Sequence, residues 1–271
     1  MRKSFDCLEY TEKDIRDGTS VMGYYKNTLN NRYGYLKETG CMLEISHEDL
    51  LEYISCKIMK DLGFNAPDID LFSDDGDDFW LSYDLLNNNL SLYDLKFNCY
   101  NIDGFTDKTE KFKSMISSID EKILNFTILL GSNNYDKLHE EFIQILFMDC
   151  ILENHDFKSD NMKISYDSNN PDSARFMCYD YGVSLHPDPV QNNGFFYYFN
   201  SKEMIKMLIE NYSDELISLL DRLNLLNNDY LVNLLSDSEF DAINKEEVIS
   251  LITNNINYSK EIYNNINNYT K

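Results

Sequence analysis

The spacing of apolar residues changes along this chain from a strand-like pattern to a helical one. Up to about residue 83, short aromatic-rich segments alternate with turn signals, and residues 32–37 and 79–83 are typical of strands. From residue 87 onward, apolar positions recur mainly at the period of an α-helix. The pattern predicts a small β-rich part followed by a larger helical part.

One helix is predicted within the strand-like half. Ser46 is a suitable N-cap with acidic residues after it, and Gly63 is a suitable helix end. The apolar residues between them have helical spacing: Leu50, Leu51, Ile54, Ile58, Met59 and Leu62. A further extended segment at residues 69–72 follows this helix.

Two short strands are predicted inside the helical half. Residues 136–153 carry apolar side chains on one broad face and predict a buried helix, and residues 162–166 and 176–179 are typical of strands joined by a turn. The start of the first strand of a hairpin lies beside the end of the second, so we expect Asn161 and Asp180 to lie close together. Amphipathic helices are predicted after residue 198, at residues 203–209, 215–225 and 246–263.

The chain is strongly acidic, with 24 Lys and Arg against 47 Asp and Glu and a formal net charge of −23 over 271 residues. Such a charge argues against a nucleic-acid backbone or an anionic membrane as the main partner. No apolar run is long enough to span a bilayer, and no signal-peptide pattern is visible. The six cysteines are scattered without a CxxC pair, which is typical of free thiols. We therefore expect a cytoplasmic protein.

Three oxygen-bearing side chains have the spacing used for phosphoryl transfer. Asp156 and Asn161 lie five residues apart, and Asp180 follows in a Tyr-Asp-Tyr-Gly segment after the predicted hairpin. Asp156 would face the acceptor hydroxyl, while Asn161 and Asp180 would hold Mg²⁺ against the ATP phosphates. Asp156 alone could be a solvated loop residue, but the three matching offsets favour a catalytic role.

Lys37 is the candidate for the lysine that contacts the α- and β-phosphates. It ends a predicted strand ahead of the predicted helix, on which Glu52 lies where an ion-pair partner belongs. Because the chain is acidic, a nucleotide site must be locally basic, which adds weight to each nearby lysine. Glu48 and Glu44 are competing partners, and an exposed, unpaired Lys37 is the alternative.

Residues 17–27 are the candidate phosphate loop. They supply Ser20, Gly23 and Lys26 ahead of the Lys37 strand, and backbone N–H groups in such a turn bind phosphate oxygens. No Walker motif occurs in the chain. An ordinary surface loop is therefore an equally good interpretation of this segment.

The remaining candidates are Lys158, His155 and the strand end at residues 80–84. Lys158, two residues past Asp156, would neutralise the γ-phosphate or lie in solvent. His155 is interpreted as a structural residue that fixes the catalytic loop. Residues 80–84, including Tyr83, would form the hinge whose backbone meets adenine, although their rings could equally belong to the core.

Three blocks of this sequence resemble the HipA-type serine/threonine kinases, the toxin kinases of bacterial toxin–antitoxin pairs, and their HipA-like relatives. Residues 52–67 are similar to a helix that begins with the ion-pair Glu and ends in Leu-Gly, with a Pro soon after. Residues 179–180 are similar to the family's Tyr-Asp metal site. In residues 147–161 the shared positions are Asp149, Asn154, Asp156 and Asn161.

The resemblance implies an α+β, two-lobed, protein-kinase-like fold, with an N-lobe at residues 1–84 and a helical C-lobe at residues 85–271. It implies transfer of the ATP γ-phosphate, with Mg²⁺, to a Ser or Thr hydroxyl of a protein. It also implies that Ser20 is a regulatory autophosphorylation site and that an antitoxin protein is a candidate partner. The chain is shorter than full toxin kinases, and the family's extra N-terminal subdomain is expected to be absent.

The sequence departs from the family beside the catalytic position. The family has Arg-His or Gly-His after its catalytic Asp, where this chain has Phe157-Lys158, and a small residue where Glu153 stands. Two alternatives therefore stay open: a pseudokinase that acts as an interaction module, and a small-molecule phosphotransferase of kinase-like fold. A lipid kinase is disfavoured by the net charge.

Overall fold

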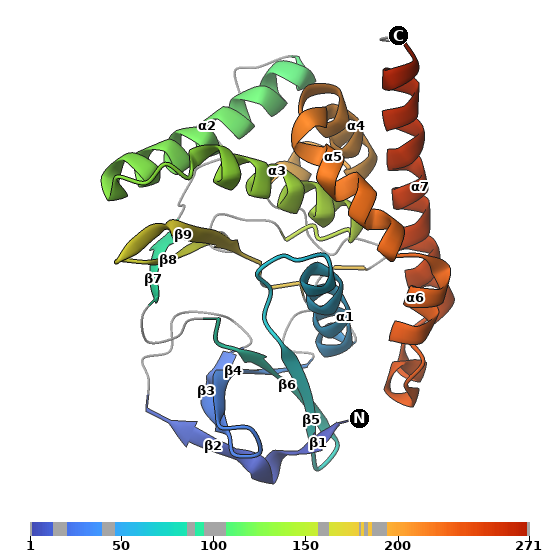
Figure 1. The fold of residues 1–271 in the computed structure, drawn as a ribbon. Helices are drawn as coiled ribbons and strands as arrows, with labels where there is room; N and C mark the ends of the chain where they lie inside the picture. The colour runs from blue at the N-terminus through green and yellow to red at the C-terminus, as the bar shows by residue number, and fades with distance from the viewer. Residues whose placement is uncertain are drawn as a thin grey trace.

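The computed structural model describes residues 2–12, 21–39, 47–85, 90–94, 107–156, 163–178, 180–181, 184–185 and 194–269 (Figure 1). Within these residues a curled β-sheet with one helix forms the N-terminal part, and a group of helices forms most of the rest. The predicted α+β organisation is confirmed: a small β-rich lobe precedes a larger helical lobe.

The small lobe is built on a sheet of six strands in the order β1-β5-β6-β4-β3-β2. β1 pairs with β5 in parallel, and the other neighbours are antiparallel. The strands predicted at residues 32–37, 69–72 and 79–83 are confirmed as β4, β5 and β6. The elements of this sheet are β1 (Lys3–Ser4), the 3₁₀ helix η1 (Phe5–Cys7), β2 (Leu8–Thr11), β3 (Val21–Asn27), β4 (Arg32–Glu38), β5 (Ile69–Asp74) and β6 (Asp77–Tyr83).

The register of β4 separates the two faces of the sheet. Leu36 is fully buried in a small core whose other members are Phe72, Phe79, Leu81 and Tyr83. Successive side chains of a strand point to opposite faces, so Lys37 lies on the other face, where it is the cross-strand neighbour of Trp80. Trp80 belongs to the main core, which continues through the helical lobe. Lys37 therefore faces the helical lobe.

The predicted helix of the small lobe is α1 (Glu48–Asp61). Its expected N-cap Ser46 lies outside the described residues. His47, with a left-handed φ of 68°, precedes the helix, and its carbonyl accepts the N–H groups of Leu50 and Leu51. The chain leaves the helix at Gly63, whose φ of 88° is a conformation that favours glycine and confirms the predicted end.

Helix α3 (Tyr135–Ile151) is the centre of the helical lobe, as its broad apolar pattern predicts. It packs against four other helices and against β9, and every residue of its last turns, from residue 142 to 151, is buried. The other helices of this lobe are α2 (Lys108–Leu130), η4 (Gly194–Tyr197), α4 (Ser201–Asn211), α5 (Ser213–Arg222), η5 (Leu223–Leu225), α6 (Asn228–Leu234), η6 (Ser238–Ala242) and α7 (Lys245–Tyr269).

The predicted hairpin is confirmed as β8 (Lys163–Asp167) and β9 (Asn170–Met177). Its turn is tighter than the predicted one, because the Asp167 carboxylate accepts the Asn169 N–H at 2.8 Å and lets β9 begin at the next residue. A third strand, β7 (Leu90–Asp94), pairs with β8 in a region that the sequence predicted to be helical. That prediction was wrong because the short strand is stabilised by its partner and not by its own pattern.

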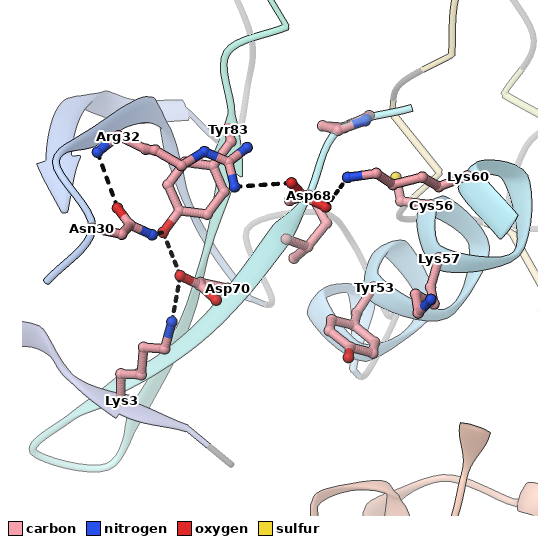
Figure 2. A pocket seen from close by; sticks show the side chains of 12 residues that line it. Lys3, Asn30, Arg32, Tyr53, Cys56, Lys57, Lys60, Asp68, Asp70 and Tyr83 are labelled. Carbon is pink, nitrogen blue, oxygen red and sulfur yellow. Dashed lines mark hydrogen bonds and ion pairs between the residues drawn. The ribbon is translucent and has the colours of Figure 1, made fainter. Parts of the chain in front are cut away.

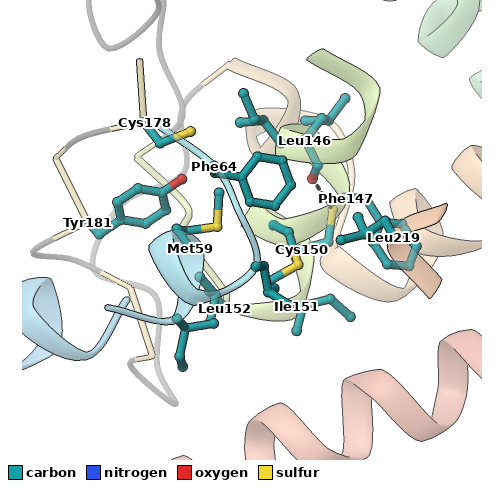
Figure 3. Close-up of a cluster of buried hydrophobic side chains, with 14 of the residues drawn as sticks. Met59, Phe64, Leu146, Phe147, Cys150, Ile151, Leu152, Cys178, Tyr181 and Leu219 are labelled. Carbon is teal, nitrogen blue, oxygen red and sulfur yellow. Dashed lines mark hydrogen bonds between the residues drawn. The ribbon is translucent and has the colours of Figure 1, made fainter. Parts of the chain in front are cut away.

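The two lobes share one hydrophobic core. Met59 of α1 and Phe64 after it lie among residues of α3, including Leu146 and Cys150 (Figure 3). Tyr181 closes the same cluster from the segment that follows the hairpin. Burial of apolar side chains contributes about 1.5–3 kcal/mol each, so this contact fixes α1, and with it the Lys37 face, against the end of α3.

Two expectations drawn from composition concern the helices and the thiols. No helix of the described ranges combines the length and the apolar character that a membrane crossing requires. Cys7, Cys56, Cys150 and Cys178 are free, and Cys41 and Cys99 lie outside the described residues.

Gly34 provides a test of the contact between β4 and β6. A Cβ atom there would lie 2.4 Å from the Ser82 carbonyl oxygen and 2.9 Å from the Tyr83 Cα. Because both are backbone atoms, Gly34→Ala must push the strands apart, and we expect a loss of about 1–3 kcal/mol in the free energy of unfolding measured in urea.

Gly131→Asn is the control for this substitution. Gly131 ends α2 with a φ of 64°, a conformation that Asn tolerates, and a Cβ atom there would meet nothing within 4 Å. A Gly34→Ala protein as stable as the Gly131→Asn protein would contradict the close approach of the two strands.

Candidate active site

Lys37 of β4 forms an ion pair that reaches from the small lobe to the helical lobe. Its Nζ lies 3.0 Å from Asp180 Oδ1 and 5.6 Å from the centre of the Trp80 ring. The Lys37 side chain is 12% exposed and that of Asp180 is 36% exposed. Burial alone would lower the pKa of Lys37, but the carboxylates of Asp180 and Glu52 raise it above its usual value. Lys37 is therefore a largely buried, charged ammonium group.

Glu52 lies beside this ion pair on α1 and is fully buried. The backbone N–H groups of Tyr181 and Asp180 lie near its carboxylate, whose Oε2 has no hydrogen-bond partner among the described residues. Burial raises the pKa of Glu52, while Lys37 and these two N–H groups act against that rise. Glu52 thus lies against the backbone segment that carries Asp180.

The contact of Lys37 differs from the predicted one. Among the described residues, the carboxylate within 4 Å of its Nζ belongs to Asp180 and not to Glu52. The Glu52 carboxylate lies against the backbone of the Asp180 segment, and its Oε2 has no hydrogen-bond partner among the described residues. Glu48, the competing partner, is also buried, and burial raises its pKa to about 7 although Lys37 lowers it. Glu44 lies outside the described residues.

Asp180 has a strained backbone, with a left-handed φ of 68°. Such a conformation is uncommon for a residue other than glycine and persists where the surroundings hold it. The hairpin delivers this segment, because Lys163 at the start of β8 pairs with Met177 at the end of β9. Asn161, the second predicted metal ligand, lies outside the described residues, so its closeness to Asp180 stays a prediction.

Asp156 lies in the loop after α3 and is only 2% exposed. The loop is attached to the end of the helix by Asn154, whose backbone N–H binds the Asp149 carbonyl at 2.8 Å and whose amide binds the Asp149 carboxylate at 2.9 Å. The Tyr181 hydroxyl donates a second hydrogen bond to the Asp149 carboxyl group. The residues after α3 and those after the hairpin are therefore bound to the same buried side chain.

Glu153 attaches the same loop to two distant helices. Its Oε2 lies 2.7 Å from His155 Nε2 and accepts the Ser201 hydroxyl of α4 at 2.5 Å. Its Oε1 accepts the Asn255 amide of α7 at 2.9 Å. Burial raises the pKa of Glu153, but these three partners outweigh it and hold the pKa below the usual value. The sequence marked Glu153 only as a departure from a family pattern and did not predict this role.

His155 has the structural position that the sequence predicted. Its ring stacks on Phe196 with centroids 4.6 Å apart and planes 14° from parallel. Its Nε2 is bound to Glu153, as described above. Since Asp156 is the next residue in the chain, the stacked ring and the Glu153 contact hold the catalytic candidate in place.

The described part of the predicted phosphate loop is a strand, and residues 17–20 lie outside the described residues. From Val21 the chain is strand β3, with a register irregularity between Val21 and Gly23. Lys26 pairs with Tyr33, four residues before Lys37 on β4, a distance of about 13 Å along the strand. The structure therefore does not bring Lys26 to Lys37. The expectation of a loop failed here because both neighbouring strands pair with this segment.

Gly23 has a packing reason to be glycine. A Cβ atom there would lie 2.9 Å from the Tyr25 ring and 3.1 Å from the Tyr10 ring. Its predicted phosphate contact is not tested by this observation. Ser20 and Lys158 lie outside the described residues, so their roles stay predictions.

The Tyr83 side chain lies on the sheet face away from Lys37. Its hydroxyl accepts the amides of Asn27 at 2.6 Å and Asn30 at 2.8 Å, and its ring lies 4.0 Å from the Arg32 guanidinium. Tyr83, Asn30 and Arg32 line a pocket of about 300 Å³ (Figure 2). The ring of Tyr83 is thus not brought to the other predicted site residues, and its backbone N–H binds the Asp68 carbonyl at 3.0 Å.

The pocket beside Tyr83 is lined by ion pairs and is separate from the Lys37 site. Lys3 pairs with Asp70 at 2.5 Å, Arg32 with Asp68 at 2.8 Å, and Lys60 with Asp68 (Figure 2). The residues that line it do not include Lys37, Glu52, Asp156 or Asp180. Since none of the catalytic candidates lines this pocket, we place the candidate active site at Lys37.

A curled sheet with a buried lysine, a helix with a glutamate beside it, and aspartates after a buried helix and after a hairpin define a protein-kinase-like architecture. Two solved kinase structures have a similar fold. The Helicobacter pylori proinflammatory kinase CtkA superposes with a TM-score of 0.67 over 98% of this chain and 97% of its own, at 13% identity. HipA of Shewanella oneidensis MR-1, solved with HipB and operator DNA, superposes with a TM-score of 0.52 over 94% of this chain and 70% of its own, at 10% identity.

These similarities concern the fold. No family model matches the sequence, and no curated protein matches it. The resemblance to HipA-type kinases inferred from short motifs is therefore confirmed by the three-dimensional arrangement.

Asp149 provides a test by pH. Burial raises the pKa of its carboxyl group to about 8, although the hydrogen bonds from Asn154 and Tyr181 lower it. The unfolded chain has a pKa near 3.9, so between about pH 4 and pH 8 the folded state keeps a proton that the unfolded state has released. The stability from this group is complete below pH 4 and is lost as the pH rises towards 8.

We expect the neutral isostere Asp149→Asn to lose less stability than the wild type between pH 5 and pH 8, by about 1–3 kcal/mol, in urea unfolding at each pH. Asp75→Asn, at an exposed turn with a φ of 46°, is the control and should follow the wild type. Parallel pH curves for Asp149→Asn and wild type would contradict a protonated, buried Asp149.

Proposed function

We propose that this chain is a HipA-like kinase that transfers the ATP γ-phosphate, with Mg²⁺, to a Ser or Thr hydroxyl of a protein. The observation that carries the proposal is the partly buried ion pair between Lys37 and Asp180, with the fully buried Glu52 beside it on α1. It joins a phosphate-binding cation to a hard oxygen ligand at the boundary between the lobes. We place that boundary at residues 84 and 85.

Each residue has a defined task in the proposed reaction. The Lys37 ammonium group would bind the α- and β-phosphates, because it is fully charged and held by carboxylates on the same face. Asp156 would accept the hydrogen bond of the acceptor hydroxyl, orient it for in-line attack and take its proton. Its position is set by Asn154 and by the Glu153–His155 contact.

The donor set suits Mg²⁺. Asp180 supplies a carboxylate next to Lys37, and Asn161 would supply an amide oxygen; phosphate and water oxygens complete the octahedral shell that Mg²⁺ prefers. When bound, the ion neutralises charge on the phosphates. The residues described in the structure contain no cluster of three His, Cys, Asp or Glu side chains suited to a metal ion.

The remaining assignments extend this proposal to residues around the phosphates and to partners. Ser20 and Gly23 would lie near the phosphates, and Lys158 near the γ-phosphate. HipA of Shewanella oneidensis was solved with HipB and operator DNA. An antitoxin-like protein is therefore a candidate partner in the cytoplasm, while the charge of −23 opposes direct contact with DNA.

A second candidate is a pseudokinase, a module that binds nucleotide without transferring phosphate. It is favoured by the burial of Asp156, which is 2% exposed. An acceptor hydroxyl would have to reach a carboxylate that the described residues largely cover. The two candidates predict the same nucleotide binding and differ in phosphoryl transfer.

Substitutions at the proposed site separate these candidates. Asp156→Asn should keep the affinity for Mg·ATP and lower transfer of radiolabelled phosphate at least about 100-fold, because it removes the proton acceptor. Lys37→Ala should raise the dissociation constant for Mg·ATP at least about 10-fold by removing the cation. Calorimetry measures the dissociation constant for Mg·ATP, and an autophosphorylation assay measures the transfer of radiolabelled phosphate.

Lys57→Ala is the matched control, since Lys57 is an exposed lysine of α1 paired with Asp61. It should change neither quantity. Mg·ATP binding without transfer in the wild type would select the pseudokinase. No binding and no transfer, in wild type as in Asp156→Asn, would end the kinase proposal.

Ser20 is proposed as the autophosphorylation site. After incubation with Mg·ATP, the intact mass of the wild type should rise by one phosphate, and peptide mapping should place it on Ser20. Ser20→Ala should remove that increase, whereas Ser4→Ala, in the first strand, should keep it. Phosphate found only on other residues of an active enzyme would refute the assignment.

A further inference from the structure

The cavity of about 300 Å³ beside Tyr83, here called the Tyr83 pocket, is rich in basic residues. Over the whole chain 47 acidic residues outnumber 24 basic ones, whereas the reverse holds in the lining of this pocket. Its basic lining residues are Lys3, Arg32, Lys57 and Lys60, and its acidic ones are Asp68 and Asp70. The Tyr83 pocket is therefore a local exception to the acidic character of the chain.

The basic residues lie on two sides of the Tyr83 pocket (Figure 2). Lys3 and Arg32 belong to strands β1 and β4, and Lys57 and Lys60 belong to α1. Lys57 donates to both carboxylate oxygens of Asp61, at 2.6 and 2.7 Å, and Asp61 does not line the pocket. Apart from that pair, three cations lie beside two carboxylates, so the lining keeps a positive charge.

The Asp68 carboxylate brings Arg32 and Lys60 together. Its Oδ2 lies 2.8 Å from Arg32 Nη1, and its Oδ1 pairs with Lys60 Nζ. One carboxylate neutralises only one of these two cations. A guanidinium group has five N–H donors and an ammonium group has three, and within the described part of the chain each of the two cations pairs with this one carboxylate. Donors and positive charge therefore remain for a ligand.

The Arg32 guanidinium is held in place by its neighbours. It lies 4.0 Å from the centre of the Tyr83 ring. The Tyr83 hydroxyl in turn accepts the Asn30 amide at 2.8 Å and donates to the Asp70 carboxylate. A planar guanidinium fixed on an aromatic ring is pre-organised to bind phosphate oxygens in a bidentate manner.

The size of the Tyr83 pocket exceeds that of a single ion. A water molecule has a share of about 30 Å³ in the liquid, and pockets for small molecules begin at about 300 Å³. Apolar side chains lie beside the cations in the lining, namely Tyr53, Pro67 and Ile69. The pocket therefore has room for a small organic group next to a phosphate.

We propose that the Tyr83 pocket binds a small organic phosphate, with the phosphate group between Arg32 and Lys60. A phosphate monoester carries a charge of about −1.5 to −2 at pH 7 and three acceptor oxygens, so it can bind both cations at once. Such a ligand joins β4 to α1 across the pocket. Since Lys37, Asp156 and Asp180 do not line the pocket, the proposal goes beyond the proposed kinase activity and does not depend on it.

Two probes test the site by ³¹P nuclear magnetic resonance at pH 7.5 and constant ionic strength, without Mg²⁺ or ATP. The probes are inorganic phosphate and glycerol 3-phosphate. Both should bind the wild type saturably, glycerol 3-phosphate at least as tightly as inorganic phosphate. Arg32→Gln and Lys60→Gln should each raise the dissociation constant about 5-fold or more, because each removes charge-assisted hydrogen bonds to the phosphate.

Lys206→Gln is the matched control for the loss of one positive charge. Lys206 is an exposed lysine of α4 that pairs with Glu210 four residues later, in the helical lobe. Its replacement should leave both dissociation constants within about twofold of the wild type, since an exposed pair of this kind contributes little.

Asp68→Asn separates a ligand site from a mere cluster of ion pairs. The amide keeps an oxygen that accepts a hydrogen bond from Arg32 or Lys60, but it removes the negative charge that competes with phosphate. The affinity for glycerol 3-phosphate should therefore rise about threefold or more. Weaker binding in Asp68→Asn would contradict the proposal.

A measurement on the wild type locates the ligand. The Arg32 Nε–Hε signal is assigned by its absence from the spectrum of Arg32→Gln, which should fold because the Arg32 side chain is 46% exposed. This signal should shift as glycerol 3-phosphate is added and should give the same dissociation constant as the ³¹P titration. Binding confined to the Lys37 site would leave the Arg32 signal unmoved.

Four further outcomes would overturn the proposal. They are no saturable binding of either probe, unchanged affinity in Arg32→Gln and Lys60→Gln, an equal loss in Lys206→Gln, and tighter binding of inorganic phosphate than of glycerol 3-phosphate. None of these measurements uses ATP. A failure of phosphoryl transfer would therefore end the proposed function and leave this site standing.

Discussion

A charged lysine in a largely dry environment is the constraint on which this structure depends. Lys37 is 12% exposed, and an ammonium group in such a place is costly unless carboxylates compensate it. Asp180 does so from the helical lobe and Glu52 from α1. Three segments far apart in the sequence must therefore converge for the charge to be tolerated. These segments meet at the proposed phosphate site. Folding stability and the proposed function therefore both require Lys37, Asp180 and Glu52 to lie together.

The convergence is reinforced by hydrogen bonds that lie behind the reacting groups. The Asp180–Tyr181 backbone lies against the buried Glu52 of α1, and the Tyr181 hydroxyl lies beside Asp149 of α3. Asp149 in turn binds Asn154, two residues before Asp156. This chain of contacts connects the small-lobe helix, the hairpin exit and the catalytic loop. Removal of any one of these side chains would destabilise the others, because a buried polar network is costly when it is only partly satisfied.

The sequence predicted the features that depend on local periodicity and missed those that depend on register. Helices α1 and α3 and the β8–β9 hairpin follow from apolar spacing and turn residues. Strand β7 was missed, because a five-residue strand is defined by its partner β8.

In the candidate site, too, the residues were predictable from their spacing in the sequence, whereas their contacts depend on strand register and backbone conformation. Lys37, Glu52 and Asp180 were named from spacing, and they lie together. The Lys37–Asp180 contact and the position of Tyr83 away from Lys37 were not predictable, since one depends on a left-handed backbone at residue 180 and the other on strand parity.

Glu153 has a consequence for how this protein could be regulated. Through Asn255 and Ser201 it binds α7 and α4, so the order of the loop that carries Asp156 and the docking of the C-terminal helix are thermodynamically linked. A partner that binds α7 would change the conformational freedom of Asp156 without contacting the Lys37 site. The linkage is reciprocal. A ligand that orders the loop must also stabilise the docking of α7.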